Sequence, residues 1–133
     1  MREIKFRGKT GTVEGKKWVY GYLYKINSFF SEAYQYFIKN EHLQETIIDE
    51  ATIGQFIGLK DKNGKEIYEG DIVSFNLKSD SEGQPYIIGY IEYQTTFSGY
   101  RIMSFEGSFA LDYNIKDIEV IGNIYDNPEL LKK

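Results

Sequence analysis

The segment over residues 58–73, GLKDKNGKEIYEGDIV, constrains the fold of this chain more than any other. Its centre predicts a hairpin, because Asn63 and Gly64 both tolerate the positive φ of a type I′ turn between two strands. A Glu-Gly-Asp corner follows and leads into an apolar strand. Short strands joined by such corners are typical of a small closed barrel, and the segment holds no obvious catalyst.

Composition narrows the classes of function. The chain of 133 residues fits one domain, or a barrel with a smaller companion. It has no cysteine, which excludes disulfides, thiolate nucleophiles and cysteine-based metal sites. Twelve tyrosines, nine phenylalanines and one tryptophan favour half-buried strands. The formal net charge of −4, with acids and bases interspersed, argues against binding of duplex nucleic acid through its phosphates.

The N-terminal residues alternate charged and apolar side chains and lack the apolar run of a secretory signal. No window of the sequence approaches the ~20 consecutive apolar residues that a membrane helix requires. We therefore expect a cytoplasmic protein that does not engage a membrane.

Many aromatic residues, strands bounded by glycine turns, and alternation of apolar and polar residues at residues 2–7 and 71–77 together predict a mainly β fold. The expected strands cover residues 2–7, 18–25, 34–39, 53–57, 71–77, 86–93, 100–105 and 118–125, while 43–48 fits a strand or one helical turn. The glycine-rich residues 8–17 are expected to form a loop. Asn127 and Pro128 predict a short C-terminal helical turn, with Asn127 as its cap.

A polar stretch at residues 49–52 divides the chain. We predict an N-terminal β-rich segment over residues 1–51. Residues 52–133 are predicted to form a barrel that ends in the helical turn, because short strands spaced by turns are typical of small barrels.

The strand predicted at residues 18–25 carries the main candidate surface. A period of two places four aromatic side chains on one face, namely Trp18, Tyr20, Tyr22 and Tyr24. This face has three interpretations: an ordinary core or tyrosine-rich surface, a protein interface in which Tyr and Trp supply binding energy, or a stacking platform for single-stranded bases. The last interpretation assigns phosphate contacts to Arg2, Lys5, Lys16 and Lys17.

Two sequences that resemble ligand-binding motifs fail on spacing. Residues 8–10, Gly-Lys-Thr, lack the glycine of a phosphate-binding loop five residues earlier, where Glu3 stands. Treating residues 61–64 as part of a calcium loop leaves Leu59 and Gly70 at positions that require carboxylates. The simpler interpretations are a flexible glycine turn and a hairpin tip.

Carboxylate pairs are the remaining enzymatic option. Glu69 with Asp71, and Asp117 with Glu119, are two residues apart and would share a strand face. The simpler interpretation of the first pair is a turn in which Asp71 accepts hydrogen bonds from nearby backbone. His42 is the single histidine, so it lacks the partners of a zinc site or a catalytic triad and is expected to be exposed. A magnesium site built from carboxylates alone stays open, but nothing singles out its ligands. We expect no catalytic residue, metal or cofactor.

Three blocks of sequence are distinctive in combination: residues 1–7 (MREIKFR), residues 52–73, and residues 118–130 (IEVIGNIYDNPEL). Together they resemble the YopX family, which comprises small proteins of bacteriophages and prophages. The resemblance implies an SH3-like β-barrel in the C-terminal part, an N-terminal β-rich segment before it, and no assigned enzymatic activity. It offers no catalytic or metal-binding residues.

The resulting hypothesis is a non-enzymatic phage or prophage accessory protein that acts through protein–protein contacts. A second copy of the chain is the first expected partner, because the strand at residues 18–25 is apolar on both faces. A host or phage protein is a further candidate. The alternative is a nucleic-acid-binding module that uses the aromatic strand face.

Overall fold

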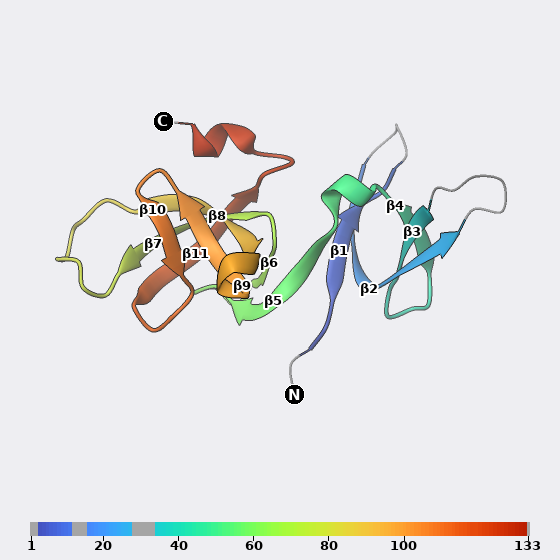
Figure 1. The fold of residues 1–133 in the computed structure, drawn as a ribbon, viewed down its shortest axis with the longest axis horizontal. Coiled ribbons are helices and arrows are strands. Elements are labelled where there is room, and N and C mark those ends of the chain that lie inside the picture. Colours follow the sequence, from blue (N-terminus) through green and yellow to red (C-terminus); the bar gives the residue numbers. More distant parts are fainter. Residues whose placement is uncertain (1–2, 12–15, 28–33, 133) are drawn as a thin grey trace. The chain divides into compact units, whose positions relative to one another are not determined.

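The computed structural model describes residues 3–11, 16–27 and 34–132 (Figure 1). These residues form a mainly β fold of antiparallel strands with three short 3-10 helices, as the alternating pattern predicted. The chain separates into two compact units, Met1–Phe56 and Ile57–Lys133. The predicted division into domains after residue 51 stays a prediction, because a compact unit need not fold independently.

The first unit is an antiparallel sheet in the order β4-β3-β2-β1-β5. Its elements are β1 (Phe6–Lys9), β2 (Trp18–Asn27), β3 (Tyr34–Lys39), β4 (Glu45–Ile48), the 3-10 helix η1 (Glu50–Thr52) and the start of β5 (Gly54–Lys60). Strand β2 pairs with β1 through its first half and with β3 through its second half. The segment at residues 43–48, for which a strand or a helical turn was expected, forms a strand at its C-terminal end.

Two expectations about the N-terminal residues were wrong. The first strand begins at Phe6, which pairs with Gly21 of β2; residues 22–27 of β2 pair with β3. Gly8 and Lys9 belong to β1 and not to a flexible loop. Gly8 is buried, and a Cβ at this position would collide with the side chain of Ile48. Glycine is thus required for the close approach of β1 to this part of the core.

The second unit contains a five-stranded antiparallel sheet in the order β10-β9-β8-β7-β11. Its elements are β6 (Glu66–Tyr68), β7 (Asp71–Leu77), β8 (Ile87–Gln94), η2 (Thr95–Phe97), β9 (Gly99–Ser104), β10 (Gly107–Ala110), β11 (Ile115–Asn123) and η3 (Pro128–Leu131). Strand β5 pairs with β6 as a hairpin. No pairing among the described residues joins β10 to β11, so the predicted closed SH3-like barrel is not established.

The core of the second unit is apolar and collects residues from both the hairpin and the sheet. Its buried members are Ile57, Ile67, Val73, Phe75, Ile91 and Ile102. Buried and more exposed residues alternate along the middle of β8, whereas β7 is buried at most of its positions. Burial of these side chains is the main source of stability for this unit.

The hairpin predicted at Asn63 and Gly64 is present, but its turn is not of type I′. Gly64 has a φ of 82°, whereas Asn63 keeps a negative φ. The carbonyl of Asp61 accepts a hydrogen bond from the Gly64 N–H at 3.0 Å. This is a type I turn followed by a left-handed glycine, the usual solution for a slightly longer hairpin loop.

The C-terminal turn η3 begins at Pro128, as the sequence predicted. The prediction that Asn127 caps it was wrong. The side-chain oxygen of Asn127 instead accepts a hydrogen bond from the Asn123 N–H at 3.2 Å. The asparagine therefore stabilises the end of β11.

Candidate functional site

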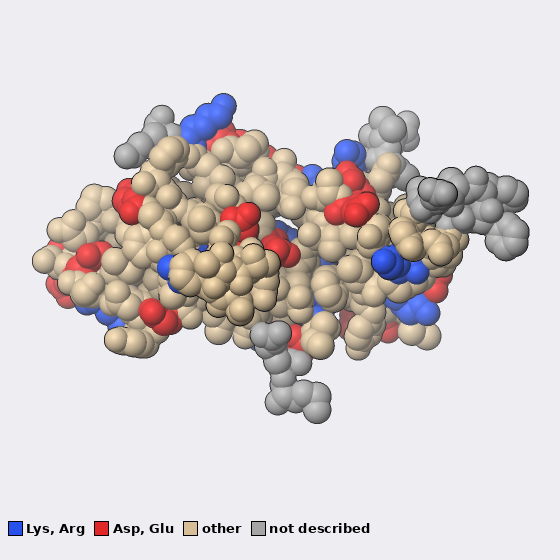
Figure 2. Space-filling model, in the orientation of Figure 1, with Lys and Arg blue, Asp and Glu red and all other residues tan. Residues whose placement is uncertain are grey.

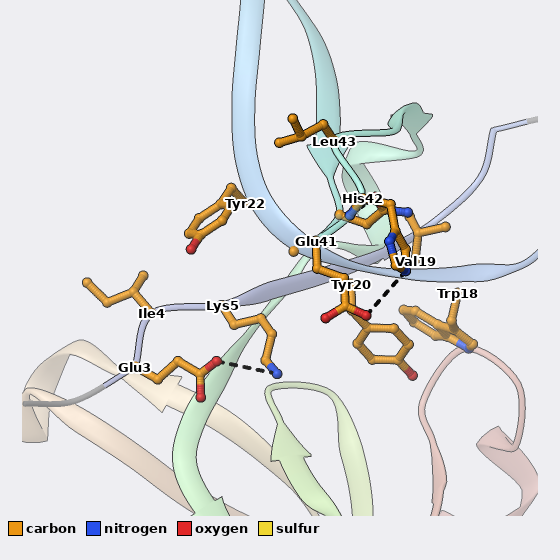
Figure 3. Close-up of a pocket in the computed structure, with 12 residues that line it drawn as sticks. Glu3, Ile4, Lys5, Trp18, Val19, Tyr20, Tyr22, Glu41, His42 and Leu43 are labelled. Carbon is orange, nitrogen blue, oxygen red and sulfur yellow. Dashed lines mark hydrogen bonds and ion pairs between the residues drawn. The ribbon is translucent and has the colours of Figure 1, made fainter.

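The first unit carries an open groove of about 700 Å³ at the place where three parts of the chain meet (Figure 3). Residues 3–5 form one side, the start of β2 crosses it, and the turn at residues 40–43 between β3 and β4 forms the other side. Three of the four predicted aromatic residues line this groove, namely Trp18, Tyr20 and Tyr22.

The three aromatic side chains differ in what they offer to a partner. Tyr22 is 71% exposed and Tyr20 is 43% exposed. Trp18 is half-buried, and the guanidinium carbon of the buried Arg7 lies 4.4 Å from the centroid of one of its rings. The ammonium of Lys9 lies 5.6 Å from the Trp18 ring as well. Trp18 therefore makes cation–π contacts within the unit, and the tyrosines are the accessible members.

Tyr24 does not line the groove, so the groove brings together only three residues of the predicted four-residue face. Its ring stacks on Phe37 with the centroids 5.4 Å apart. Burial raises the pKa of the Tyr24 hydroxyl, and a hydrogen bond to the Glu45 carboxylate raises it further. The side-chain hydrogen bond from Tyr24, together with Lys39 at 3.2 Å, lowers the pKa of Glu45. Tyr24 thus contributes to packing of the sheet.

Three of the four residues predicted as phosphate contacts lie in the described part of the chain, and only Lys5 of these lines the groove. Lys5 lines the groove, but its ammonium lies 3.6 Å from the Glu3 carboxylate and 5.8 Å from the Phe56 ring centroid. Lys16 and Lys17 are exposed and do not line the groove. Arg2 lies outside the described residues.

Leu43 is a groove residue that the sequence did not single out. It has a φ of 61°, in the left-handed region, and its side chain is 74% exposed. Leucine reaches this conformation at a cost of about 1–2 kcal/mol, because its Cβ approaches the following carbonyl oxygen. A large apolar side chain is therefore held in a strained conformation with most of its surface in solvent.

Asn40 holds this turn in place. Its backbone carbonyl accepts from the Leu43 N–H at 3.0 Å. Its side-chain oxygen accepts from the backbone N–H groups of His42 at 2.9 Å and Gln44 at 3.0 Å. Its side-chain nitrogen donates to the side chain of Gln44 at 2.9 Å. These bonds compensate the strain at Leu43.

The turn at residues 61–65 has the same hydrogen-bond pattern. The Asp61 carbonyl accepts from Gly64, and its carboxylate accepts from the backbone N–H groups of Asn63 and Lys65, each at 2.9 Å. Leu43 and Gly64 therefore stand at equivalent positions, three residues after the Asx residue. An Asn or Asp three residues earlier was the signal in the sequence that could have predicted the special position of Leu43.

Charges around the groove are compensated locally. Glu3 faces Lys5, and the Glu41 carboxylate lies 3.5 Å from Nε2 of His42. Over the whole unit, residues 1–56 hold eight basic and seven acidic residues, whereas residues 57–133 hold eight and thirteen. Figure 2 shows acids and bases interspersed on the face drawn. The acidic excess therefore belongs to the second unit.

One residue of each carboxylate pair considered for catalysis makes a structural contact. Asp71 is 1% exposed and accepts a hydrogen bond from the Tyr68 N–H at 2.7 Å, which confirms the turn interpretation. Glu119 pairs with the Lys62 ammonium at 3.3 Å. Within the described ranges, no group of three or more His, Asp or Glu side chains is arranged to hold a metal ion.

The described part of the chain contains no helix long and apolar enough to cross a membrane.

A family model and a solved structure each match nearly the full length of the chain. The family model described as YopX protein matches residues 5–132. The crystal structure of protein EF1440 from Enterococcus faecalis is 26% identical in sequence, with a TM-score of 0.59. That match covers 99% of this chain and 100% of the other. Among curated proteins, no match was found.

Proposed function

The chain belongs to the YopX family, as its sequence blocks predicted, and we propose that it is a phage or prophage accessory protein that binds other proteins and has no catalytic activity. It acts in the cytoplasm of a bacterial host, and its partners are a second copy of itself and a host or phage protein. The observation that carries this proposal is the exposed, strained Leu43 on the rim of an aromatic groove.

The lining of the groove has the composition of a protein interface. Ile4 is 60% exposed, and it joins Tyr20, Tyr22 and Leu43 around the same hollow. Tyrosine is enriched among residues that dominate binding energy, and large exposed apolar patches mark interaction sites. The paired charges at the rim favour a partner that presents apolar side chains rather than a dense charge of one sign.

The conformation of Leu43 supports a binding role independently of composition. The equivalent position of the second turn is glycine, which adopts a positive φ without strain. A leucine there destabilises the free protein and exposes apolar surface. Backbone strain that persists although a glycine would remove it is typical of functional sites.

A nucleic-acid-binding role is the second candidate, favoured by Arg7 and Lys9 beside Trp18. Aromatic rings next to cations are the ingredients of a single-strand platform. Two observations weigh against it: Arg7 is buried, and Lys5 is paired with Glu3. Protein binding is therefore the better supported function.

We also propose that the second unit is an SH3-like barrel in a partly open form, which serves as the scaffold. The hairpin β5-β6 is tied to β11, because the Lys62 N–H donates to the Ile118 carbonyl at 2.9 Å. A barrel closed through such single hydrogen bonds, with few bonds of a regular strand ladder, fits the SH3-like barrel that the family resemblance implies.

The test is photo-crosslinking from the groove. A benzophenone amino acid replaces Tyr22, and the protein is irradiated both pure and in extracts of prophage-induced host cells. The matched control carries the same group in place of Tyr113, which is 85% exposed in the second unit. We expect protein adducts from position 22 that position 113 does not give. Adducts sensitive to nuclease would favour the second candidate, and no adduct specific to position 22 would overturn the proposal.

A further inference from the structure

The hairpin turn at residues 61–65 places a side-chain amide directly before a glycine. An asparagine cyclises when the backbone nitrogen of the next residue attacks its side-chain carbonyl carbon, Cγ, and a side chain on that next residue obstructs the attack. Of the asparagines in the chain, only Asn63 is followed by glycine, which has no Cβ. Asn40 precedes Glu41, and Asn127 precedes a proline, whose nitrogen carries no hydrogen. The sequence therefore singles out Asn63 for cyclisation.

The surroundings of Asn63 leave room for this reaction. Asn63 and Gly64 are both exposed, and a Cβ at position 64 would have no neighbour within 4 Å among the described residues. The side-chain nitrogen of Asn63 donates to Oε1 of Glu119 at 3.4 Å, which is longer than a typical hydrogen bond. The side-chain amide is therefore held weakly and is accessible to water.

The backbone of the turn opposes the reaction. The Gly64 N–H donates to the Asp61 carbonyl at 3.0 Å. The Asp61 carboxylate accepts from the N–H groups of Asn63 and Lys65. The Gly64 nitrogen must lose its proton before it attacks, so its hydrogen bond to Asp61 has to open first. The reaction therefore proceeds in the small fraction of molecules whose turn is open, and Asp61 controls that fraction.

We propose that Asn63 is a site of spontaneous deamidation, which proceeds through a cyclic imide with Gly64. The Gly64 nitrogen forms a bond to Cγ of Asn63, the bond from Cγ to Nδ2 breaks, and ammonia leaves with the proton that the Gly64 nitrogen gave up. Water then opens the five-membered imide at one of its two carbonyl carbons. Attack at Cγ gives aspartate. Attack at the backbone carbonyl carbon gives isoaspartate, in which the main chain runs through the former side chain.

Either product changes the contacts of the hairpin tip. Aspartate at position 63 adds one negative charge to the formal net charge of −4 and puts a carboxylate where the amide donated to Glu119. The two carboxylates repel each other, and the Lys62 ammonium, 3.3 Å from Glu119, offsets only part of this repulsion. Isoaspartate adds a carbon atom to the main chain, so the hydrogen bonds that Asp61 accepts within the turn cannot all keep their geometry. Deamidation should therefore loosen the hairpin from β11.

Peptide mass spectrometry of protein kept at neutral and at mildly alkaline pH provides the measurement. We expect the mass change of an amide converted to an acid at residue 63, with isoaspartate among the products. The change should be faster at the higher pH, because the attacking nitrogen must be deprotonated. Asn40 is the internal control, since it begins the equivalent turn but precedes a residue with a side chain.

Three variants test the parts of the mechanism. Asn63→Gln keeps the amide and Gly64 but would have to close a six-membered ring, so the product at residue 63 should be lost. Asp61→Asn weakens the turn. A loss of about 1 kcal/mol raises the open fraction about fivefold, and deamidation of Asn63 should accelerate by about that factor or more. Asp112→Asn, at an exposed carboxylate of another turn, should leave the rate at Asn63 unchanged.

An Asn63 that stays unmodified, or that deamidates no faster than Asn40, would overturn the proposal. Aspartate formed without isoaspartate would rule out the imide, because direct hydrolysis of the amide gives aspartate alone. Equal rates in the wild type and Asp61→Asn would contradict control by Asp61. Aged wild type, separated from fresh protein by ion exchange, should have a lower urea midpoint, and an unchanged midpoint would refute the loosening of the hairpin.

Discussion

The Asp61 carboxylate accepts a hydrogen bond from the backbone N–H of Val120 at 3.0 Å, across 59 residues of sequence. The same carboxylate accepts from Asn63 and Lys65 within its own turn. One side chain therefore shapes the β5-β6 hairpin and joins it to β11. Asp61 is only 7% exposed, so water does not replace these bonds readily.

Replacing this carboxylate should destabilise the second unit. Asp61→Asn puts an amide where three N–H groups converge, and at least one of them loses its acceptor. We expect a loss of about 1–3 kcal/mol in the free energy of unfolding, measured by urea titration. Asp112→Asn is the matched control, because that exposed carboxylate accepts a single local bond from the Asn114 N–H. Equal effects of the two substitutions would contradict the role assigned to Asp61.

The same site makes stability depend on pH. Burial alone would raise the pKa of the Asp61 carboxyl, but the hydrogen bonds from Val120, Lys65 and Asn63 outweigh it and lower the pKa below its ordinary 3.8. Because the folded-state pKa is lower than the unfolded one, unfolding takes up a proton between the two values. The stabilisation is complete above the unfolded pKa and is lost as pH falls through the folded pKa.

Urea midpoints measured between about pH 2 and pH 7 test this dependence. The wild type should lose more stability on acidification than Asp61→Asn, which has no carboxylate to protonate. If the two proteins gave parallel curves, titration of Asp61 would not contribute.

Gly8 is the subject of a packing prediction in the first unit. A Cβ at this position meets the Ile48 side chain inside the core, so Gly8→Ala should destabilise the unit by about 1–3 kcal/mol. Gly11→Ala is the control, because a Cβ there has no neighbour within 4 Å. Thermal denaturation of the two variants compares them directly. If Gly8→Ala were as stable as Gly11→Ala, the prediction would be refuted.

Much of the fold was predictable because alternation reports a half-buried strand wherever it occurs. The strands at residues 34–39 and 71–77 begin and end as predicted. Strand β10 was missed, since its first residue, Gly107, indicated only a turn. The end of β1 was missed because Gly8 fits both a loop and a close strand contact, and only its neighbour Ile48 decides between them.

The groove was less predictable, because it depends on parts of the chain that are distant in sequence. The pattern placed Trp18, Tyr20 and Tyr22 together, and all three line it. It also included Tyr24, whose environment is set by its cross-strand partner Phe37. The role of Leu43 could not be predicted from the sequence, because leucine rarely adopts a positive φ. In the structure, the hydrogen bonds of Asn40 hold Leu43 in this unfavourable conformation.

Exchanging the residues at the two equivalent turn positions tests the assignment of strain. Leu43→Gly relieves about 1–2 kcal/mol of backbone strain and adds about 0.5–1 kcal/mol of unfolded-state entropy. We therefore expect a protein more stable by up to about 1.5 kcal/mol. Gly64→Leu should lose a similar amount or more because of the positive φ at this position, since a Cβ there has no neighbour within 4 Å to clash with.

Chemical denaturation of both single variants and of the double exchange gives the measurement. The two effects should have opposite signs and should add, since the two turns share no contact partners among those described. A Leu43→Gly variant less stable than the wild type would mean that the leucine side chain stabilises the isolated chain. Its exposure would then have a structural cause, and the case for Leu43 as a binding residue would fail.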